Sequence, residues 1–263
     1  MTTLYINGIG ILAPGIENWP ECKTILTQQK TYQPNTLYKI TSQIIPAKER
    51  RRASRTSLIA AYVAEQAVNQ AEVLADQLSS VFSSYGGDLQ IADKLCTSLA
   101  DNDPFISPIQ FHNSVHNAPA GCWSIATQAQ STTTSLAGSH FSFQAALLES
   151  VALLETEDND ILLACYDSKT PEPLNSQHTS NADCGVALIL SKHSSNQSII
   201  QLSLSLTNKT DINNKIPACL KPLITANASM QSLILLDAIA NKQSSVILDY
   251  LDNLQIKCLL KNV

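Results

Sequence analysis

Charged residues are scarce in this sequence: they make up 15% of its 263 residues, and 17 Lys and Arg stand against 22 Asp and Glu, for a formal net charge of −5. Domains that bind phosphate backbones are usually basic, so this balance argues against nucleic acid as the main partner. With 44% hydrophobic residues, the chain can bury a full core, in one large domain or in two small ones. We therefore expect a soluble globular protein.

Closely spaced cysteine pairs are missing as well. The cysteines are odd in number, widely scattered and include no C-x-x-C pair, which argues against a disulfide framework. The pattern predicts free thiols in a reducing, cytoplasmic compartment. The seven cysteines are Cys22, Cys96, Cys122, Cys165, Cys184, Cys219 and Cys258.

The first residues lack the features of a targeting or membrane segment. Met1–Pro14 has no basic flank, and Asn7, Gly8 and Gly10 interrupt its apolar run. A signal peptide needs the flank and a membrane span needs a longer run, so a buried first strand is the better interpretation.

Strand-like and helix-like segments alternate along the chain, which predicts an α/β core. Phe141–Leu154 is apolar almost all the way round, so we expect a helix buried between layers. Predicted strands are Leu4–Leu12, Val81–Tyr85, Asp160–Tyr166, Gly185–Ser191, Ser198–Leu206 and two within Val246–Leu260; further predicted helices are Thr56–Ala71 and Ser229–Ala240.

Two features concern organisation. Ser131–Leu136 is β-branched and polar, a strand by propensity without an apolar face, and at a sheet edge it would be a site for pairing with another chain. The pattern changes near residue 195, the only candidate boundary, which divides the chain into residues 1–195 and 196–263. We see no internal repeat.

The middle of the chain resembles the N-terminal half of the β-ketoacyl synthases. In that family an Asn-x-x-Ala-Gly helix leads to a strand, to the nucleophilic Cys at the start of a buried helix, and then to a strand that follows acidic residues. Phe111–Ile125, which contains Asn117 and Gly121, is followed here by matching elements up to Tyr166. The resemblance is closest to the short chain length factors of aryl polyene biosynthesis. It implies a thiolase-like layered α/β fold with a complete first half (1–195) and a reduced second half (196–263).

The same resemblance implies that the catalytic groups are missing. With Asn117 and Asp160 aligned to the family without a gap, the nucleophile position falls on His140; a register four residues earlier places it on Leu136. Condensation also needs two histidines, which the family takes from its second half, to decarboxylate the donor and stabilise the oxyanion. No histidine follows His193. The prediction is a pseudo-enzyme without cofactor.

Other possible sites are weaker. His112 and His116 lie four apart but lack an acidic or cysteine partner at ligand spacing, so an interface or hydrogen-bonding role is favoured over a metal site. Gly138-Ser139-His140 does not match the G-x-S-x-G nucleophile motif. Cys165 lies within an apolar strand and is read as a small buried hydrophobe. Gly86-Gly87 is interpreted as a turn because no phosphate-loop residues accompany it.

The segment Lys48–Arg55 holds five of the 17 basic residues in eight positions: Lys48, Arg50, Arg51, Arg52 and Arg55. It is either a solvated helix start with internal salt bridges or a docking site for an acidic acyl carrier protein. Arginine suits the second role because it pairs bidentately with carboxylate and phosphate.

The resemblance implies a partner. Ketosynthases dimerise through the strand before the nucleophile, which corresponds to Ser131–Leu136, so the expected function is a chain-length-factor-like subunit that pairs with a complete ketosynthase and bounds its acyl channel. Ordinary interface packing is the alternative role of the same residues. Two rival functions stay open: a divergent acyltransferase or hydrolase, and a stand-alone carrier-protein binding module. The candidate interface and channel residues are Phe111, His112, His116, Asn117, Trp123, Thr132, Thr133 and Thr134.

Overall fold

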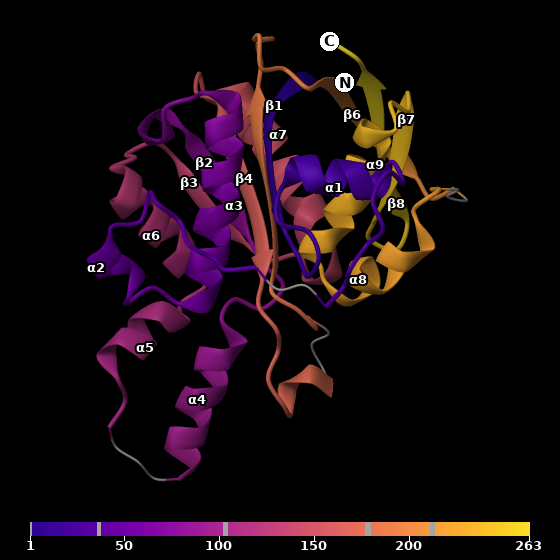
Figure 1. Cartoon of the computed structure of the whole chain (residues 1–263). Helices are drawn as coiled ribbons and strands as arrows, with labels where there is room; N and C mark the ends of the chain where they lie inside the picture. Colours follow the sequence, from indigo (N-terminus) through magenta and orange to yellow (C-terminus); the bar gives the residue numbers. More distant parts are fainter. Residues whose placement is uncertain (1, 36–37, 102–104, 177–179, 211–213) are drawn as a thin grey trace.

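The computed structural model describes residues 2–35, 38–101, 105–176, 180–210 and 214–263. Eight strands of these residues form one mixed sheet in the order β3-β2-β4-β5-β1-β6-β8-β7, and both chain ends lie at the same end of the molecule (Figure 1). The strands are β1 (Thr2–Leu12), β2 (Ser79–Ser83), β3 (Thr133–Leu136), β4 (Ile161–Asp167), β5 (Cys184–Ser191), β6 (Ile200–Asn208), β7 (Ser245–Tyr250) and β8 (Leu254–Lys261).

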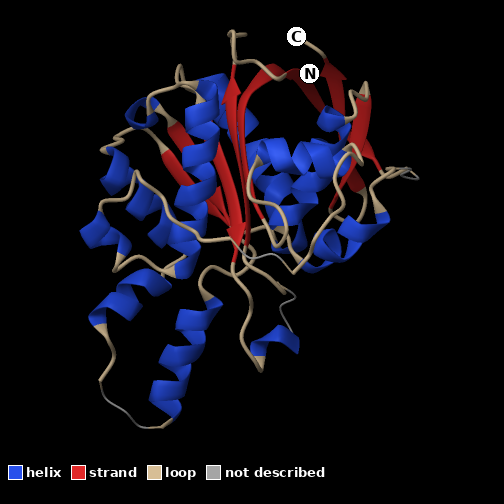
Figure 2. Cartoon of the chain, viewed as in Figure 1, coloured by secondary structure: helices blue, strands red, loops and turns tan. Residues whose placement is uncertain are grey.

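Helices cover both faces of this sheet (Figure 2). They are α1 (Trp19–Leu26), α2 (Ala47–Arg50), α3 (Arg55–Ala71), α4 (Leu89–Ala100), α5 (Pro108–Ser114), α6 (Ala118–Thr127), α7 (Ser142–Thr156), α8 (Lys221–Ala226) and α9 (Leu233–Ala240). The sheet separates two hydrophobic cores, one that includes residues of α1, α7 and α9 and one under α3 and α6. Side chains of β4 alternate between them, because successive residues of a strand point to opposite faces: Leu163 belongs to the first core and Leu162 to the second.

Strand β1 is central and explains the two glycines of the N-terminal run. A Cβ on Gly8 would lie 2.1 Å from the carbonyl oxygen of Ala67, and one on Gly10 would lie 1.9 Å from that of Val63. Only glycine lets α3 approach so closely. The pairing of β1 with β6 ends at Ile6. Beyond it, a side chain of α3 satisfies a backbone donor of β1, because Gln70 accepts a hydrogen bond from the Ile9 N–H at 3.0 Å.

Helix α7 matches the predicted buried helix. It packs on β2 and β4 and also contacts β7 on its other side, and Phe143 and Leu147 are fully buried. The sheet curls past this helix, so that residues before and after position 195 share one core.

The strands after residue 195 continue the same sheet. β1 pairs with β5 through Tyr5–Leu12 and with β6 through Thr2–Ile6, both antiparallel. The sheet therefore runs without a break across the predicted boundary between residues 1–195 and 196–263. That these parts correspond to a complete first half and a reduced second half of the family fold stays a prediction.

One predicted strand is displaced by two residues. β2 runs from Ser79 to Ser83 instead of Val81 to Tyr85, because the polar Ser79 and Ser80 are buried between two parallel neighbours. The hydroxyls of Ser80 and Thr133 lie 3.0 Å apart, which satisfies the buried polar group.

Helices α4 and α5 form an arm that extends away from the sheet (Figure 1). They pack on each other, and neither contains a buried residue. Within the part of the chain that is described, none of the helices has the length and apolar content needed to cross a membrane.

Candidate functional site

Strand β3 lies at the edge of the sheet, as predicted for Ser131–Leu136. It pairs in parallel with β2, and the carbonyl oxygens of Thr132 and Leu136 accept hydrogen bonds from the N–H groups of Ser80 and Ser84 at 2.9 and 3.3 Å. Because backbone groups alternate along a strand, the N–H and C=O of Thr133 and of Ser135 point away from β2. These groups are free to pair with a strand of another chain.

An exposed apolar surface lies on the helices that precede this edge. Sequence reasoning selected only Phe111 of this set, because amphipathic spacing does not reveal which apolar faces lack a partner. The exposed side chains, which we call the α4–α6 apolar surface, are Leu99 (60% exposed), Ile109 (49%), Phe111 (62%), Val115 (47%) and Ile125 (70%). Elements α4, α5, α6 and β3 each contact the next, so the helices that carry these side chains form a series that ends at the sheet edge. An isolated chain rarely exposes so many large apolar side chains together.

The two histidines of this region do not share a helix face. His112 is exposed on α5, which ends at Ser114, and His116 lies in the turn after it. The His116 ring nitrogen Nε2 lies 2.9 Å from the carbonyl oxygen of Leu136, so this ring joins the α5–α6 turn to β3. This contact fits a hydrogen-bonding role for His116, while an interface role stays a prediction. Among the described residues, no three His, Cys, Asp or Glu side chains gather as a metal site.

Trp123 is placed differently from the prediction. It is 1% exposed and belongs to the chain's own core, against α3. Direct contact with a partner's channel is therefore wrong for Trp123, because its apolar ring is used to fasten α6 to the body. Asn117 is exposed and occupies the position before the first residue of α6, while Thr132 donates a hydrogen bond to Glu157 at 2.7 Å.

The turn from β3 into α7 contains His140, where the gap-free alignment to the family predicts the nucleophile position. Ser139 has φ of 53°, a left-handed backbone that is costly for a residue with a side chain. Ser142 stabilises the turn: its Oγ accepts from the Gly138 N–H at 3.1 Å and donates to the Ser139 carbonyl at 2.6 Å. A strained strand–turn–helix is thus present although the G-x-S-x-G sequence is not. Ser139 and His140 are both exposed there.

No thiol stands at this turn. The His140 ring lies against the ring of Tyr85, with centroids 5.1 Å apart. Cys165 is fully buried in β4, and burial raises the pKa of its thiol well above the ordinary value, so it is not a nucleophile. Asp167 is also buried; burial raises the pKa of its carboxyl, although both oxygens accept backbone hydrogen bonds, from Tyr85 and Ser229, each 2.9 Å long. His178 lies outside the described residues.

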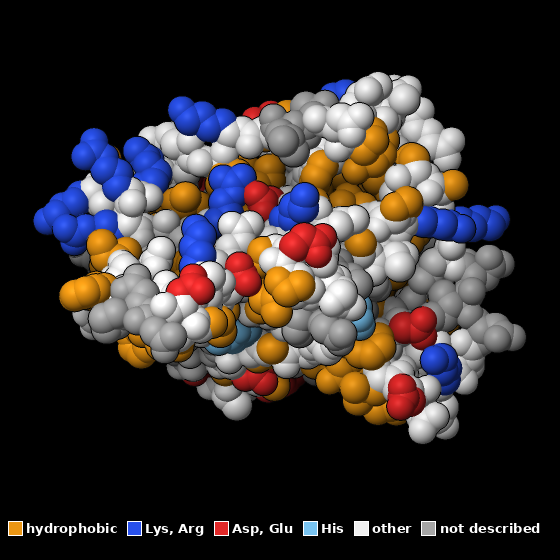
Figure 3. All heavy atoms as spheres, turned by 90° about the horizontal axis from the view of Figure 1, so that it is seen from below, with side chains coloured by type: hydrophobic (Ala, Val, Ile, Leu, Met, Phe, Trp, Pro, Cys, Tyr) orange, Lys and Arg blue, Asp and Glu red, His pale blue; other side chains and the backbone are white. Residues whose placement is uncertain are grey.

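The basic run does not act as one unit. Arg55 forms an ion pair with Asp183 (Nε to Oδ2, 2.7 Å), and Arg50 donates to the Ser42 carbonyl at 2.6 Å. Arg51 and Arg52 are exposed, and neither is in an ion pair within the described residues. Lys and Arg side chains gather at the left of Figure 3, on the side where Figure 1 shows α2.

A groove of about 430 Å³ separates this basic segment from the apolar surface. Arg52 and Glu49 line one wall, and Ile109, Val115 and Ile125 are among the apolar side chains of the other. Charged and apolar side chains therefore line the same groove.

A curled mixed sheet with a helix buried on its inner side, and a strained turn at the start of that helix, define a thiolase-like layered α/β protein. The chain belongs to the β-ketoacyl synthase family: the model of its N-terminal domain matches residues 18–251.

Solved structures agree on the fold. A ketosynthase (ApeO) in complex with its chain length factor (ApeC) from Xenorhabdus doucetiae is 21% identical with a TM-score of 0.74, over 98% of this chain and 100% of that chain. The ishigamide ketosynthase/chain length factor is 12% identical with a TM-score of 0.75, over 100% of both chains. A β-ketoacyl synthase from Burkholderia phymatum is 11% identical with a TM-score of 0.62, over 93% of this chain and 71% of that chain. No curated protein matches the sequence.

Proposed function

We propose that this chain is a non-catalytic, chain-length-factor-like subunit that pairs with a complete β-ketoacyl synthase. One observation above the others supports the proposal: the turn where the alignment to the family predicts the nucleophile holds Ser139 and His140, both exposed and neither a thiol. A Claisen condensation that proceeds through an enzyme thioester requires a thiolate at that position.

The free edge of β3 supports the partnership. The outward backbone groups of Thr133 and Ser135 offer the hydrogen bonds that a strand of the partner would accept and donate. The α4–α6 apolar surface lies next to this edge and would supply the apolar area that a stable interface requires.

A role in shaping the partner's acyl channel follows from the side chains beside the edge. Phe111 and His112 are exposed on α5, and Asn117 is exposed at the start of α6. A large side chain at such a place would set the depth of a channel that crosses the interface, and hence the product length. In a polyene or aryl polyene pathway this length defines the product.

Carrier-protein docking is proposed for Arg51 and Arg52. Both are exposed beside the groove wall, and a carrier protein with an acidic surface would be attracted to them. Arg55 and Arg50 contribute less because their polar groups already have partners within the chain.

The test is co-expression with the ketosynthase encoded nearest to this chain, followed by size-exclusion chromatography with light scattering. A one-to-one complex that persists at micromolar concentration is expected, and the chain alone should be poorly soluble. A well-behaved monomer that ignores the ketosynthase but binds a carrier protein would favour a stand-alone binding module instead. Hydrolysis or transfer of an acyl group by the chain alone would favour the divergent enzyme.

A further inference from the structure

A second cavity lies away from the groove between the basic segment and the α4–α6 apolar surface, and it shares none of the lining residues of that groove. It has a volume of about 470 Å³ and opens between the end of β1, the segment around Tyr38, and the loops that follow β4 and precede β5. A water molecule in the liquid takes up about 30 Å³, so the space is large enough for an organic ligand. Nothing in the proposed pairing with a ketosynthase uses this cavity.

The polar part of the cavity has unused hydrogen-bond donors. Among the residues that the structure describes, Arg55 forms a hydrogen bond only through its Nε, to Asp183, which leaves the two terminal amino groups of its guanidinium. In Asp183, by contrast, both oxygens already accept a hydrogen bond, because the second one accepts from the Lys169 backbone N–H at 3.0 Å. The three charged side chains of the lining, Arg55, Lys169 and Asp183, therefore sum to one positive charge.

The position of Lys169 is fixed although its ammonium group is not engaged. Its backbone N–H is held by Asp183, and its carbonyl accepts from Gln90 Nε2 at 3.0 Å. No hydrogen bond or ion pair within the described ranges involves its Nζ. The backbone of Lys169 is therefore held on the cavity wall, while its side chain is exposed.

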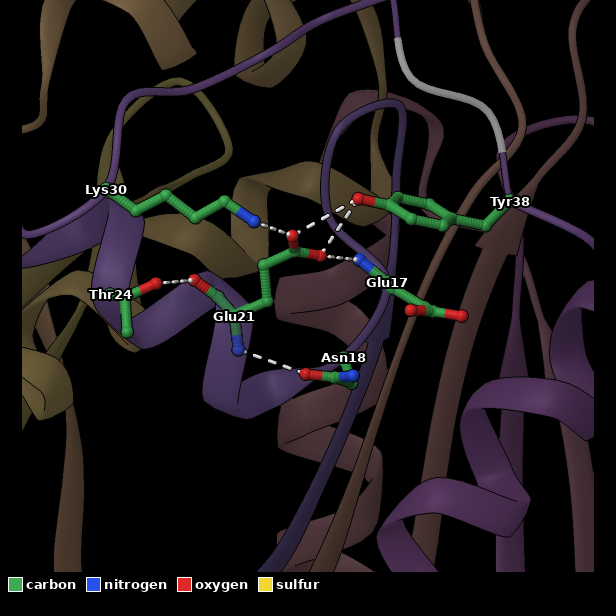
Figure 4. Close-up of polar contacts among 6 residues, drawn as sticks. All are labelled: Glu17, Asn18, Glu21, Thr24, Lys30 and Tyr38. Atoms are coloured by element: carbon green, nitrogen blue, oxygen red, sulfur yellow. Dashed lines mark hydrogen bonds and ion pairs between the residues drawn. The ribbon is translucent and has the colours of Figure 1, made fainter.

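The other walls of the cavity are apolar and are held in place. Leu12, Pro14 and Ile40 line them. The segment that carries Tyr38 is fastened to α1 through Glu21, whose carboxylate accepts hydrogen bonds from the Tyr38 hydroxyl at 3.1 and 3.2 Å, from the Glu17 N–H at 2.8 Å and from Lys30 (Figure 4). Burial raises the pKa of the Glu21 carboxyl, but these donors outweigh it and the pKa is lowered. Glu21 is therefore a charged anchor behind this wall.

We propose that this cavity binds a small organic anion with a short apolar body, either a carboxylate or a phosphate monoester. Lys169 and the free amino groups of Arg55 contact the anionic group, and Leu12, Pro14 and Ile40 contact the apolar body. One net positive charge and apolar walls select against neutral and strongly hydrophilic ligands alike.

The test is calorimetric titration of the full chain, purified with its partner, using octanoate, octyl phosphate, octanol and inorganic phosphate. At least one of the two amphipathic anions should bind, and the tighter one identifies the head group. Lys169→Gln should weaken that binding about tenfold, the size of one charge-assisted hydrogen bond. Lys169→Arg should keep it, and Lys257→Gln, at an exposed lysine on β8, should have no effect.

Several results would overturn the proposal. Octanol binding as tightly as octanoate would remove the anionic requirement, and inorganic phosphate binding as tightly as octyl phosphate would remove the apolar one. Absence of binding by both amphipathic anions, or an unchanged affinity in Lys169→Gln, would show that the cavity is not the site.

Discussion

At the residue scale, the lack of the family's expected catalytic residue types could be read from the sequence, whereas which side chains are buried and which are exposed could not. The amino-acid sequence itself shows that no cysteine lies near residue 140 and that no histidine follows His193. The burial of Trp123 and the ion pair of Arg55 depend on tertiary packing, which a list of residue types does not contain. The strained backbone of Ser139 was missed because it does not follow the G-x-S-x-G pattern.

Asp237 gives a pH prediction at this scale. It is 2% exposed on α9 and accepts hydrogen bonds from the side-chain amides of Asn241 (2.9 Å) and Gln243 (3.2 Å); burial raises the pKa of its carboxyl despite them. The folded state therefore binds more protons than the unfolded chain between the unfolded pKa of about 4 and the raised folded value. Over that window the contribution of Asp237 to stability falls as pH rises.

Asp237→Asn should remove this dependence. Urea unfolding between pH 4 and 8 should give a flatter stability profile and a gain at neutral pH, because Gln243 can turn its amide to donate or accept. Asp252→Asn, at an exposed turn residue, is the matched control and should follow the wild type. A profile of Asp237→Asn that is parallel to the wild type would contradict the buried-carboxyl account.

At the scale of elements, the sequence predicted most helices and strands because their apolar spacing is regular. Strand β2 begins two residues before its predicted start because Ser79 and Ser80, although polar, are buried in the pairing with β4. The arm of α4 and α5 was not predicted, since an amphipathic helix reveals an apolar face but not whether that face is covered within the chain.

Thr133→Pro tests the edge strand. Its N–H points away from β2, so proline removes the hydroxyl contact with Ser80 but no backbone hydrogen bond to β2, and it takes a donor from the partner strand. Affinity for the ketosynthase should fall about tenfold or more, with unchanged circular dichroism. Thr133→Val loses the same hydroxyl contact with Ser80 and keeps the N–H, so it should bind nearly as the wild type. Equal affinities for the two variants would exclude strand pairing at this position.

Phe111→Gln tests the α4–α6 apolar surface. A 62% exposed aromatic side chain contributes nothing to the core, but at an interface its truncation costs about 2 kcal/mol. We expect a loss of about thirtyfold in affinity for the ketosynthase, measured by biolayer interferometry, without loss of thermal stability. Leu206→Gln, which alters a 54% exposed side chain on β6, should leave the affinity unchanged. If Phe111→Gln also binds normally, the apolar surface serves another purpose.

At the scale of the whole molecule, a net charge of −5 hides one basic region. Composition argued against nucleic acid as the main partner but carried no information on how charge is distributed in space. The proposed carrier-protein docking site places Arg51 and Arg52 beside a groove with apolar lining. This arrangement depends on the tertiary packing of the basic segment near α5 and α6.

Arg51→Glu/Arg52→Glu should weaken carrier-protein engagement by the ketosynthase complex about tenfold at low salt, with the difference shrinking as salt is added. The complex itself should stay intact, because the substituted side chains lie outside the β3 edge. Turnover kinetics at two salt concentrations provide the measurement, with Lys23→Glu/Lys257→Glu as the control of equal charge change. Identical kinetics of the wild type and both double variants at low salt would show that Arg51 and Arg52 are ordinary solvent-exposed side chains without a docking role.

The central claim is that the chain performs no condensation itself, and one assay tests it most directly. The purified chain, its His140→Cys variant and the complex with its ketosynthase are each incubated with acyl- and malonyl-carrier protein, and ketoacyl product is measured by mass spectrometry. Product is expected only from the complex, while the variant thiol becomes acylated without condensing, because groups that act together are not restored one at a time. Ketoacyl product from the chain or its variant in the absence of the ketosynthase would contradict the account.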